Sequence, residues 1–499
     1  MTPPVPPRRL HAFHDRPHRR DGAFVLYWMI GQRRLGWNFA LDRAVAWARK
    51  LARPLVVLEA LRHDYPWASA RHHRFVLDGM RDHLDAARGR RFLYHPYVEP
   101  APGAGKGLLE ALADRACVVV TDHVPFYFLP RMIAAAAGRL PVRLEAVDSH
   151  GLLPLGEPER DFTTAHSFRI HLHKHLLDHL GEAPHPDPLA PAPGPPLPDP
   201  APLTAPEGAL APILARWPAA SGALLSGAAS VRADARVAPV PFPGGPRAAR
   251  ARLERFLAHG LPVYHERRND PDADAGSRLS PYLHWGYLSV HQVFAALRER
   301  EGWTPLRVRP EQRGKRAGWW GMSPPAEAFL DELVTWRELG FNEWVRGGAE
   351  VERFDTLPAW ARETLLAHAG DPRPHRYRLD AFDEARTHDP LWNAAQRELR
   401  TEGTIHNYLR MLWGKKILEW SAHPREALEI MYELNNRYAV DGRDPNSTTG
   451  IMWVLGRYDR GWPERDVYGK VRSMSSAATR RKVSVDGYLR RFSEQNTFL

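Results

Sequence analysis

The chain has 499 residues, more than one hydrophobic core usually holds, so its length predicts two domains. Its 69 Lys and Arg residues outnumber its 58 Asp and Glu residues, and the net charge of +11 suits a polyanionic partner without identifying one. The only cysteine, Cys117, excludes an internal disulfide framework and cysteine-based zinc fingers, and it fits a reducing compartment.

The first half of the chain changes pattern near residue 23. Residues 1–22 are rich in Pro, Arg and His and offer little to bury, so we expect a flexible basic arm. Over 23–180, amphipathic segments at 38–52, 69–88, 107–115 and 127–138 separate short, nearly continuous apolar runs: FVLYWMI, PLVVLEAL, RFLYHPYV, CVVVTD and PVRLEAVD. Buried strands that alternate with helices indicate a parallel sheet covered on both faces, so we predict a doubly wound, Rossmann-like α/β domain.

Two motifs in this half suggest a binding site but are explained without one. GAGKG at 103–107 looks like part of a phosphate loop, but position 100 is Pro and position 107 is Gly, where the motif needs Gly and Ser or Thr. His171 and His175 are four apart and could clasp a metal ion, but no acidic residue completes a catalytic site. We therefore expect GAGKG to form a loose loop. We expect the two histidines to have a structural or surface role.

Proline marks the domain boundary. Residues 181–206 are dense in Pro, which disfavours helices and central strands, so we expect a stiff extended linker. The remaining residues, 207–499, carry helical patterns and the motifs with chemical content.

Two segments of this second half combine polar groups with a predicted helix. Gly276, Ser277 and Ser280 precede one, and their amides and hydroxyls could hold an anion at its positive end, with Arg278 adding charge. An ordinary N-cap is the alternative. The amphipathic segment 329–339 places Glu332 and Trp336 four apart, hence adjacent on one α-helical face, which is also common without any function.

Residues 387–420 predict two helices broken near Gly403, because apolar residues recur at three- and four-residue spacing on both sides of it. Trp413 and Trp420 are seven apart and return to one face, whereas Trp392 lies on the preceding helix. Core packing explains any one of them. Four residues that a plain core would not contain interrupt the same face: His406, Asn407, Arg410 and Met411. We therefore expect this face to hold a polar group.

Several long motifs occur here in one order: GSRLS in 276–280, THDPLWNAAQ in 387–396, LRMLWGKKILEW in 409–420 and VDGRDPNS in 440–447. They resemble the FAD-binding half of DNA photolyases and cryptochromes, and specifically of class II cyclobutane pyrimidine dimer photolyases. The likeness covers roughly residues 255–490. It implies that an all-α, FAD-binding domain follows the α/β domain.

The resemblance implies the residues that hold reduced FAD (FADH−): Tyr264, Ser277, Arg278, Leu279, Ser280, Arg337, Arg410, Asn435, Asp441 and Asp444. Asn435 falls where the family places an amide beside flavin N5, and such an amide can accept from N5–H. Class II members usually have Asn at position 278, so Arg278 departs from the pattern. Asp441 and Asp444 could instead cap the DGRDP turn. A second, antenna chromophore of unknown identity is compatible with the family.

The resemblance also implies a lesion pocket and an electron relay. The catalytic residues would be Glu332, Trp336, Trp453, Asn407 and Met411, with a protonated Glu332 donating to the pyrimidine pair and the two tryptophans stacking on it. The electron-transfer residues would be Trp413 as the inner relay, Trp392 as the outer relay and Trp420 as a nearby alternative.

We therefore expect light-driven repair of cyclobutane pyrimidine dimers. The partner would be double-stranded damaged DNA with the dimer flipped out, and the basic run Arg480, Arg481 and Lys482 would contact its backbone, unless it is merely a solvated face. A (6-4) photolyase normally carries His in its lesion pocket, whereas this chain has Asn407 and Met411. A cryptochrome-like photoreceptor without repair activity is the alternative. No apolar run reaches a membrane span and no signal-peptide pattern opens the chain, so we expect a soluble, cytoplasmic monomer, at the nucleoid if bacterial.

Overall fold

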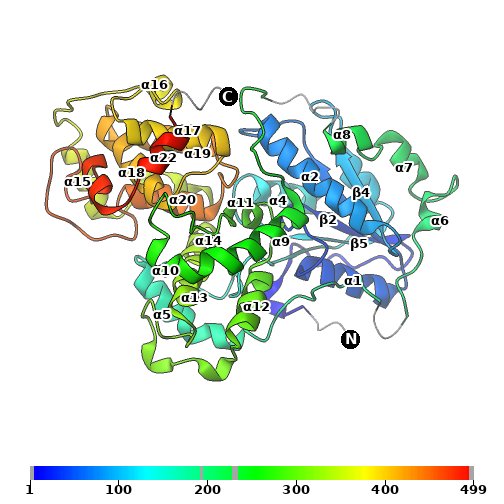
Figure 1. Cartoon of the computed structure of the whole chain (residues 1–499). Helices are drawn as coiled ribbons and strands as arrows, with labels where there is room; N and C mark the ends of the chain where they lie inside the picture. The colour runs from blue at the N-terminus through cyan, green and yellow to red at the C-terminus, as the bar shows by residue number, and fades with distance from the viewer. Residues whose placement is uncertain (1–4, 192–194, 228–233, 494–499) are drawn as a thin grey trace. The chain divides into compact units, whose positions relative to one another are not determined.

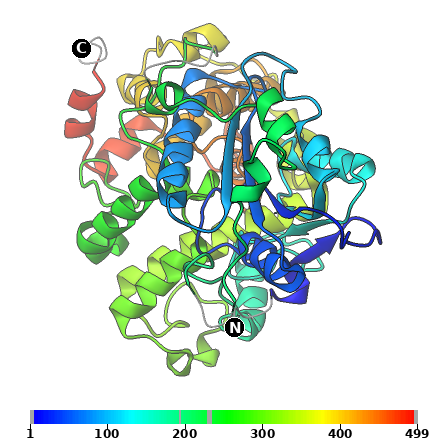
Figure 2. The same ribbon diagram turned by 90° about the vertical axis from the view of Figure 1, so that its right-hand side faces the viewer.

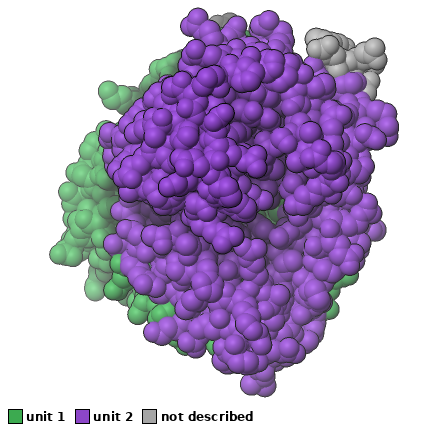
Figure 3. Space-filling model, turned by 90° about the vertical axis from the view of Figure 1, so that its left-hand side faces the viewer, with its two compact units in different colours: residues 1–159, 175–251, 279–300 green, residues 160–174, 252–278, 301–499 purple. Residues whose placement is uncertain are grey.

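The computed structural model describes residues 5–191, 195–227 and 234–493. The chain divides into two compact units, which Figure 3 colours separately. Unit 1 comprises residues 1–159, 175–251 and 279–300, and unit 2 comprises residues 160–174, 252–278 and 301–499. The units therefore do not follow chain order, and the Pro-rich segment 181–206 lies within unit 1.

Unit 1 is built on a six-stranded sheet with the order β1-β6-β5-β2-β3-β4 (Figure 1). The strands are β1 Leu10–Ala12, β2 Phe24–Met29, β3 Leu55–Leu61, β4 Leu93–Val98, β5 Ala116–Asp122 and β6 Leu144–Val147. Strands β2 to β6 pair in parallel, and β2 pairs with both β3 and β5, so the strand order reverses at β2. This is the doubly wound arrangement, and the predicted α/β fold is confirmed.

The helices between these strands are α1 Phe39–Leu51, α2 Ala70–Ala87, α3 Leu108–Ala113 and α4 Leu129–Arg139. Each lies close to its predicted segment. Helix α1 begins at Asn38, whose side chain accepts from the amides of Ala40 and Leu41, and it buries an apolar face against β2, β3 and β5. Strands β2, β5 and β6 are buried along their whole length, which is why the sequence shows apolar runs there rather than alternation.

The predicted flexible arm is wrong for the described part of residues 1–22; residues 1–4 lie outside the described residues. Strand β1 pairs antiparallel with β6 at the edge of the sheet, where Figure 2 shows it in dark blue. Arg9 is fully buried, forms an ion pair with Asp148 at 3.2 Å, and donates to the carbonyls of Gly151 and Leu152. The composition of this segment did not predict its docking, because the partners of Arg9 are remote in sequence.

The Pro-rich segment is fastened to unit 1. The His185 amide donates to Asp42, the Asp187 carboxylate pairs with Arg90 at 2.8 Å, and Leu197 joins the core. Unit 1 also contains α6 Ala201–Thr204, α7 Ala211–Arg216, α8 Gly222–Ser226 and α11 Ser280–His284, and most of α9 Gly245–Arg255 and α12 Val290–Glu301.

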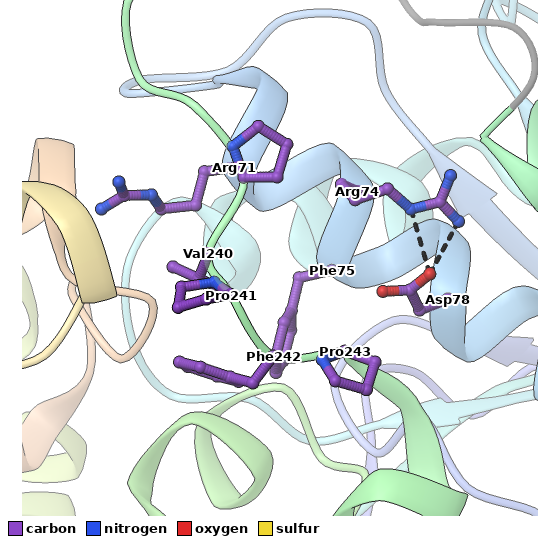
Figure 4. Close-up of a pocket in the computed structure, with 9 residues that line it drawn as sticks. Arg71, Arg74, Phe75, Asp78, Val240, Pro241, Phe242 and Pro243 are labelled. Atoms are coloured by element: carbon purple, nitrogen blue, oxygen red, sulfur yellow. Dashed lines mark hydrogen bonds and ion pairs between the residues drawn. The ribbon is translucent and has the colours of Figure 1, made fainter. Parts of the chain in front are cut away.

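Residues 239–243 cross helix α2 and enclose a small hollow of about 200 Å³ (Figure 4). Phe242 packs edge-on against Phe75 at 6.1 Å, and Arg71 donates to the carbonyl of Ala238. Arg74 pairs with Asp78 at 2.8 Å. The charged groups of this hollow therefore serve the packing of the segment on α2.

Unit 2 is helical. Its helices are α5 Ala165–His175, apart from its last residue, α10 Tyr264–Arg267, α13 Pro324–Leu330, α14 Arg337–Gly347, α15 Ala359–Ala367, α16 Leu379–Asp383, α17 Pro390–Glu402, α18 Asn407–Trp420, α19 Pro424–Tyr438, α20 Pro445–Val454, α21 Ser476–Lys482 and α22 Asp486–Arg491. Two π-helical segments interrupt the α-helices: η3 Phe256–Gly260 and η7 Asp331–Trp336. Among the helices that the structure describes, none combines the length and the apolarity that crossing a membrane requires.

The histidines of α5 take part in packing. His173 stacks on Trp319 with ring centroids 4.0 Å apart, and its Nδ1 accepts from the Gly314 amide. Burial lowers the pKa of His173 to about 3, with Arg169 and Arg313 acting in the same direction. This ring is therefore neutral and structural at physiological pH.

Replacing Arg9 with Met should destabilise unit 1 by about 3–5 kcal/mol, because the Asp148 carboxylate would remain buried without its ion pair. Burial alone raises the pKa of Asp148, and the adjacent Arg9 guanidinium brings it below the usual range. The measurement is the denaturant midpoint of the whole chain. Arg20→Met, at an exposed position of the same N-terminal segment, is the control and should change the midpoint little. Equal midpoints for both variants would contradict the docked arrangement of β1.

Candidate functional site

Helices α17 and α18 form where the sequence predicts them, and Figure 1 shows them beside α19 and α20. Asp389 caps α17 by accepting from the amides of Leu391 and Trp392. Gly403 ends this helix with a φ of +65°, a left-handed conformation that glycine adopts without strain. The predicted break at Gly403 is therefore confirmed.

Helix α18 carries a stripe of three residues spaced four apart, and such residues share one face. Asn407 is exposed, Met411 is half-buried and Lys415 is completely buried. The stripe thus passes from solvent into the interior along one helix. Two of its members, Asn407 and Met411, are predicted site residues, whereas Lys415 was not singled out in the sequence.

Three predicted cofactor residues lie on this helix and its neighbours. Arg410 of α18 pairs with Asp441 at 3.4 Å. Asn435 of α19 is buried and donates through its amide nitrogen to Asn436 and to Ser447, so its carbonyl oxygen is the end suited to accept a further bond. The arrangement offers one cation, one carboxylate and one amide acceptor.

Asp444 has the capping role that the sequence left open. Its side chain accepts from the Asn446 amide at 2.9 Å and caps α20. Asp441, by contrast, faces Arg410. The two aspartates of the DGRDP turn therefore have different partners.

The loop around Gly276 and Ser277, which is predicted to hold an anion, has a strained backbone and is held in place by side-chain hydrogen bonds. The carbonyls of Gly276 and Ser277 accept from Arg252 at 3.0 and 2.8 Å. A side chain added at Gly276 would meet nothing within 4 Å, so the loop has open space beside it. This space and the Ser277 hydroxyl suit the approach of an anion.

Arg278 has a φ of +52°, a region that Asn tolerates better than most side chains. Its guanidinium pairs with Asp274 at 3.3 Å and with Glu402 at 3.2 Å. Leu279 and Ser280 follow in unit 1, where Ser280 opens α11. Because α11 has only five residues, its dipole adds little to the predicted anion site.

The segment 329–339 is helical throughout, as predicted, but its middle is π-helical rather than α-helical. Helix α13 ends at Leu330, the π-helical segment η7 spans Asp331–Trp336, and α14 begins at Arg337. Glu332 and Trp336 both lie on the widened turn and are both half-buried. Such π-bulges are often found at functional sites, and their register depends on tertiary packing that the local pattern does not encode. Arg337, next to Trp336, is buried with its guanidinium 4.5 Å from the ring centroid of Phe341.

Arg268 lies between a predicted lesion-pocket residue and a predicted cofactor residue. Its guanidinium lies 3.2 Å from the Glu332 carboxylate and 5.4 Å from the ring centroid of Tyr264. Burial raises the pKa of Glu332, and the positive charge of Arg268 opposes this shift. Burial also raises the pKa of the Tyr264 hydroxyl, so this group remains a neutral donor. The carboxyl is therefore prepared to take up a proton if its ion pair is broken.

The three predicted relay tryptophans lie close together. Trp392 donates through its indole N–H to the Trp413 carbonyl at 3.0 Å, and Trp413 donates to Gln396 at 2.9 Å. The rings of Trp392 and Trp420 are 6.0 Å apart. Trp392 is completely buried.

Aromatic residues from a different segment lie beside Trp420 and extend the cluster toward solvent. Trp420 contacts Tyr377 at 5.8 Å and His388 at 4.9 Å, and the Tyr377 hydroxyl lies 2.9 Å from His388 Nδ1. Tyr377 is half-buried and His388 is exposed. Neither appeared among the sequence candidates, because only tertiary packing brings residue 377 to Trp420.

Trp453, at the end of α20, is half-buried among cations. Lys415 Nζ lies 5.3 Å and Arg472 Cζ 5.9 Å from its ring, and Arg472 also lies 5.1 Å from the ring of Trp462. Cations over aromatic faces hold such rings in place.

A groove of about 740 Å³ lies beside this cluster, and its lining includes Arg465, Arg472 and Lys482. Of the predicted basic run, Lys482 therefore reaches the groove and also contacts the Tyr408 ring at 5.2 Å. Arg480 and Arg481 are exposed on α21. The basic lining from residues 465 and 472 was missed in the sequence.

Known proteins resemble the chain over nearly its whole length, although no protein-family model matches it. It is 34% identical to the deoxyribodipyrimidine photo-lyase of Methanothermobacter thermautotrophicus, a match covering 94% of either chain. It is 33% identical to the deoxyribodipyrimidine photo-lyase of Oryza sativa, over 94% of this chain and 87% of the relative.

Two solved structures share the fold at low sequence identity. A class III photolyase from Agrobacterium tumefaciens has a TM-score of 0.64 at 18% identity, covering 94% of this chain and 86% of that one. A cryptochrome from Synechocystis has a TM-score of 0.61 at 17% identity, covering 94% and 88%.

The approach of α18 to α20 can be tested at Gly414. A Cβ atom there would meet Val454 Cγ2 at 2.6 Å, so Gly414→Ala should cost about 1–3 kcal/mol through overpacking. Gly450→Ala, on α20 with no atom within 4 Å of the added Cβ, is the matched control and should be neutral or slightly stabilising. Thermal unfolding of both variants is the measurement. If Gly414→Ala unfolds like Gly450→Ala, the two helices do not approach this closely.

Proposed function

The chain belongs to the deoxyribodipyrimidine photo-lyase family, and we propose that it uses light to split cyclobutane pyrimidine dimers in double-stranded DNA. The observation that carries this proposal is the widened turn η7, where a carboxyl with a raised pKa lies near a half-buried tryptophan. Arg268 joins this carboxyl to the candidate cofactor loop. The closest motif resemblance is to class II enzymes.

We propose FAD as the cofactor, since the groups present fit it. The Arg410–Asp441 pair and the Asn435 carbonyl would meet the flavin ring, while Tyr264, Ser277 and Ser280 would meet the phosphates. When bound, reduced FAD supplies an electron on absorbing light and takes it back after the dimer splits. Arg278 and Asp444 are engaged in ion pairs and in a helix cap, so they would act by shaping the loops.

The chain's own residues would position and protonate the lesion. Trp336 and Trp453 offer half-buried aromatic faces on which extruded bases can stack. Glu332 would donate a hydrogen bond to the pyrimidine as negative charge develops on it, which requires the protonated carboxyl. Its raised pKa supports this role, and a lesion that separates Glu332 from Arg268 would raise the pKa further. Asn407 and Met411 would line the same pocket from α18.

DNA would bind with its phosphates along the basic groove. Arg472 and Lys482 in its lining, with Arg480 and Arg481 exposed on α21, supply the positive charge. Neutralised phosphates release counterions, so affinity for any DNA should fall steeply with salt. A cryptochrome-like photoreceptor is the second candidate, because a cryptochrome shares the fold.

The test is dimer loss from an irradiated oligonucleotide, in light and in darkness. Wild type should repair only in light, and Trp336→Ala should lose about 1–3 kcal/mol of selective binding to dimer DNA while keeping its affinity for undamaged DNA. Repair without light, or wild type with neither dimer preference nor repair, would contradict the proposal. The latter result would favour the photoreceptor.

Glu332 should affect splitting more than binding. Glu332→Ala should lower the number of dimers repaired per absorbed photon severalfold, whereas Glu332→Gln should retain repair because its amide N–H can donate without a proton uptake step. Wild-type repair should decline as pH rises through the raised pKa of Glu332, since the carboxylate cannot donate, and the Gln variant should show no such decline. Equal pH profiles for the two proteins would exclude Glu332 as the donor.

The tryptophan relay predicts a separate defect. Trp413→Phe should slow the photoreduction of oxidised flavin and leave repair by chemically pre-reduced enzyme largely intact, because the relay serves only reduction. Flavin absorbance under illumination gives the first quantity and dimer counting gives the second. Trp217→Phe, in unit 1, is the control. If Trp413→Phe photoreduces at the control's rate, the relay does not run through Trp413.

A further inference from the structure

Lys415 is a charged side chain with no exposure to solvent. Burying an ammonium group costs several kcal/mol unless partners compensate for the lost hydration. Its Nζ donates to the carbonyl of Val454 at 2.5 Å. This carbonyl belongs to the last turn of α20, where carbonyls lack an intrahelical partner and the helix dipole favours a cation. Lys415 thus caps α20 from the side.

The position of Lys415 follows from the packing of α18 on α20. It lies one turn beyond Met411 on the stripe that begins at Asn407. The absence of a side chain at Gly414 lets α18 approach Val454, and this brings the ammonium 5.3 Å from the centroid of the Trp453 ring. One buried cation therefore touches both the backbone end of α20 and the aromatic ring adjacent to it.

Other charged groups surround the ammonium. Asp459 attracts it, and Arg472 repels it from the loop that follows α20. One Asp459 oxygen accepts from the Arg460 amide at 2.9 Å, while the other is buried and accepts no hydrogen bond among the described residues. On the α18 side, the Tyr468 hydroxyl donates to the Lys415 carbonyl and contacts Glu419, which pairs with Lys416.

We propose that protonated Lys415 is a positioning residue for Trp453 and fixes the ring against which the extruded pyrimidine stacks. The inference rests on the proposed repair function, since it gives Trp453 its ligand. The ammonium attracts the ring face electrostatically, whereas a neutral amine does not. Loss of the proton would release the ring and weaken the donor to Val454, so selective binding of dimer DNA would depend on the charge of this one side chain.

The direction of the pH effect follows from burial. Desolvation lowers the pKa of Lys415 from 10.5 to about 7, with Asp459 raising it and Arg472 lowering it. Selectivity for dimers should therefore be complete below about pH 7 and decline above it. Stability should move the opposite way: between about pH 7 and 10.5 the unfolded chain binds a proton that the folded chain has released, so the free energy of unfolding rises with pH. A purely structural lysine would produce the second trend without the first.

The experiment measures the ratio of affinities for dimer-containing and undamaged oligonucleotides, in darkness, at pH 6 and pH 8.5. In the wild-type chain the ratio should fall about 3- to 10-fold between the two pH values. Lys415→Met should show the lower ratio at both. Lys470→Met, an exposed lysine of the same unit, is the matched control and should behave like wild type.

Three outcomes separate the possibilities. A wild-type ratio that is equal at both pH values, or a Lys415→Met ratio that stays high at pH 6, overturns the inference. Trp453→Ala should lose selectivity together with its pH dependence; if it keeps both, Trp453 does not stack on the lesion and the inference is overturned, whereas the proposed function fails only if repair occurs without light or if wild type neither prefers dimers nor repairs them. Should Lys415→Met not fold, the wild-type titration, together with Trp453→Ala, decides.

Discussion

The close packing of α18 against α20 is the constraint on which the candidate site depends. At Gly414 there is no room for a side chain, because an added Cβ would meet Val454 of α20. This close contact fixes how deeply the residues of α18 are buried in the unit. Asn407 emerges at solvent, Met411 reaches half-way and Lys415 is enclosed. A single helix can therefore present polar groups at graded depths, which a surface helix with one polar and one apolar face cannot do.

Charge in this unit is arranged in compensated sets. Glu332 has Arg268, Arg410 has Asp441, and Lys415 has the carbonyl end of α20 with Asp459 near it. In a partly dehydrated site each of these groups would be costly alone, and removing one member would expose the cost of the other. Under the proposed function, DNA that separates Glu332 from Arg268 would raise the pKa of Glu332 further, and the site could respond to DNA in this way.

The sequence supports prediction where the determining interactions are local. The five parallel strands, the α17–α18 break and the α/β-then-helical order all follow from periodicity, glycine and proline within a few residues. The errors have a common origin in remote contacts. Strand β1 depends on Asp148, 139 residues from its partner Arg9, and the widened turn at Glu332 depends on the packing of unit 2. Lys415 looked like one of two adjacent lysines in a helix; both are buried, but Lys416 pairs with the Glu419 carboxylate whereas Lys415 donates to the Val454 carbonyl.

Three departures from local rules fall on predicted site residues or on their immediate neighbours along α18. The π-helical turn at Glu332, the left-handed Arg278 and the buried Lys415 each carry a local cost, and all three belong to unit 2. Natural sequences are for the most part locally consistent. Features that break the local rules persist where the surrounding packing enforces them and where the side chain that they position has a function. In the sheet of unit 1, by comparison, buried charges such as Arg9 are closed off by several hydrogen bonds within the protein. Glu332 and Lys415 instead retain the capacity to change protonation, and under the proposed function these costs are those expected of a site that binds a lesion and responds to it.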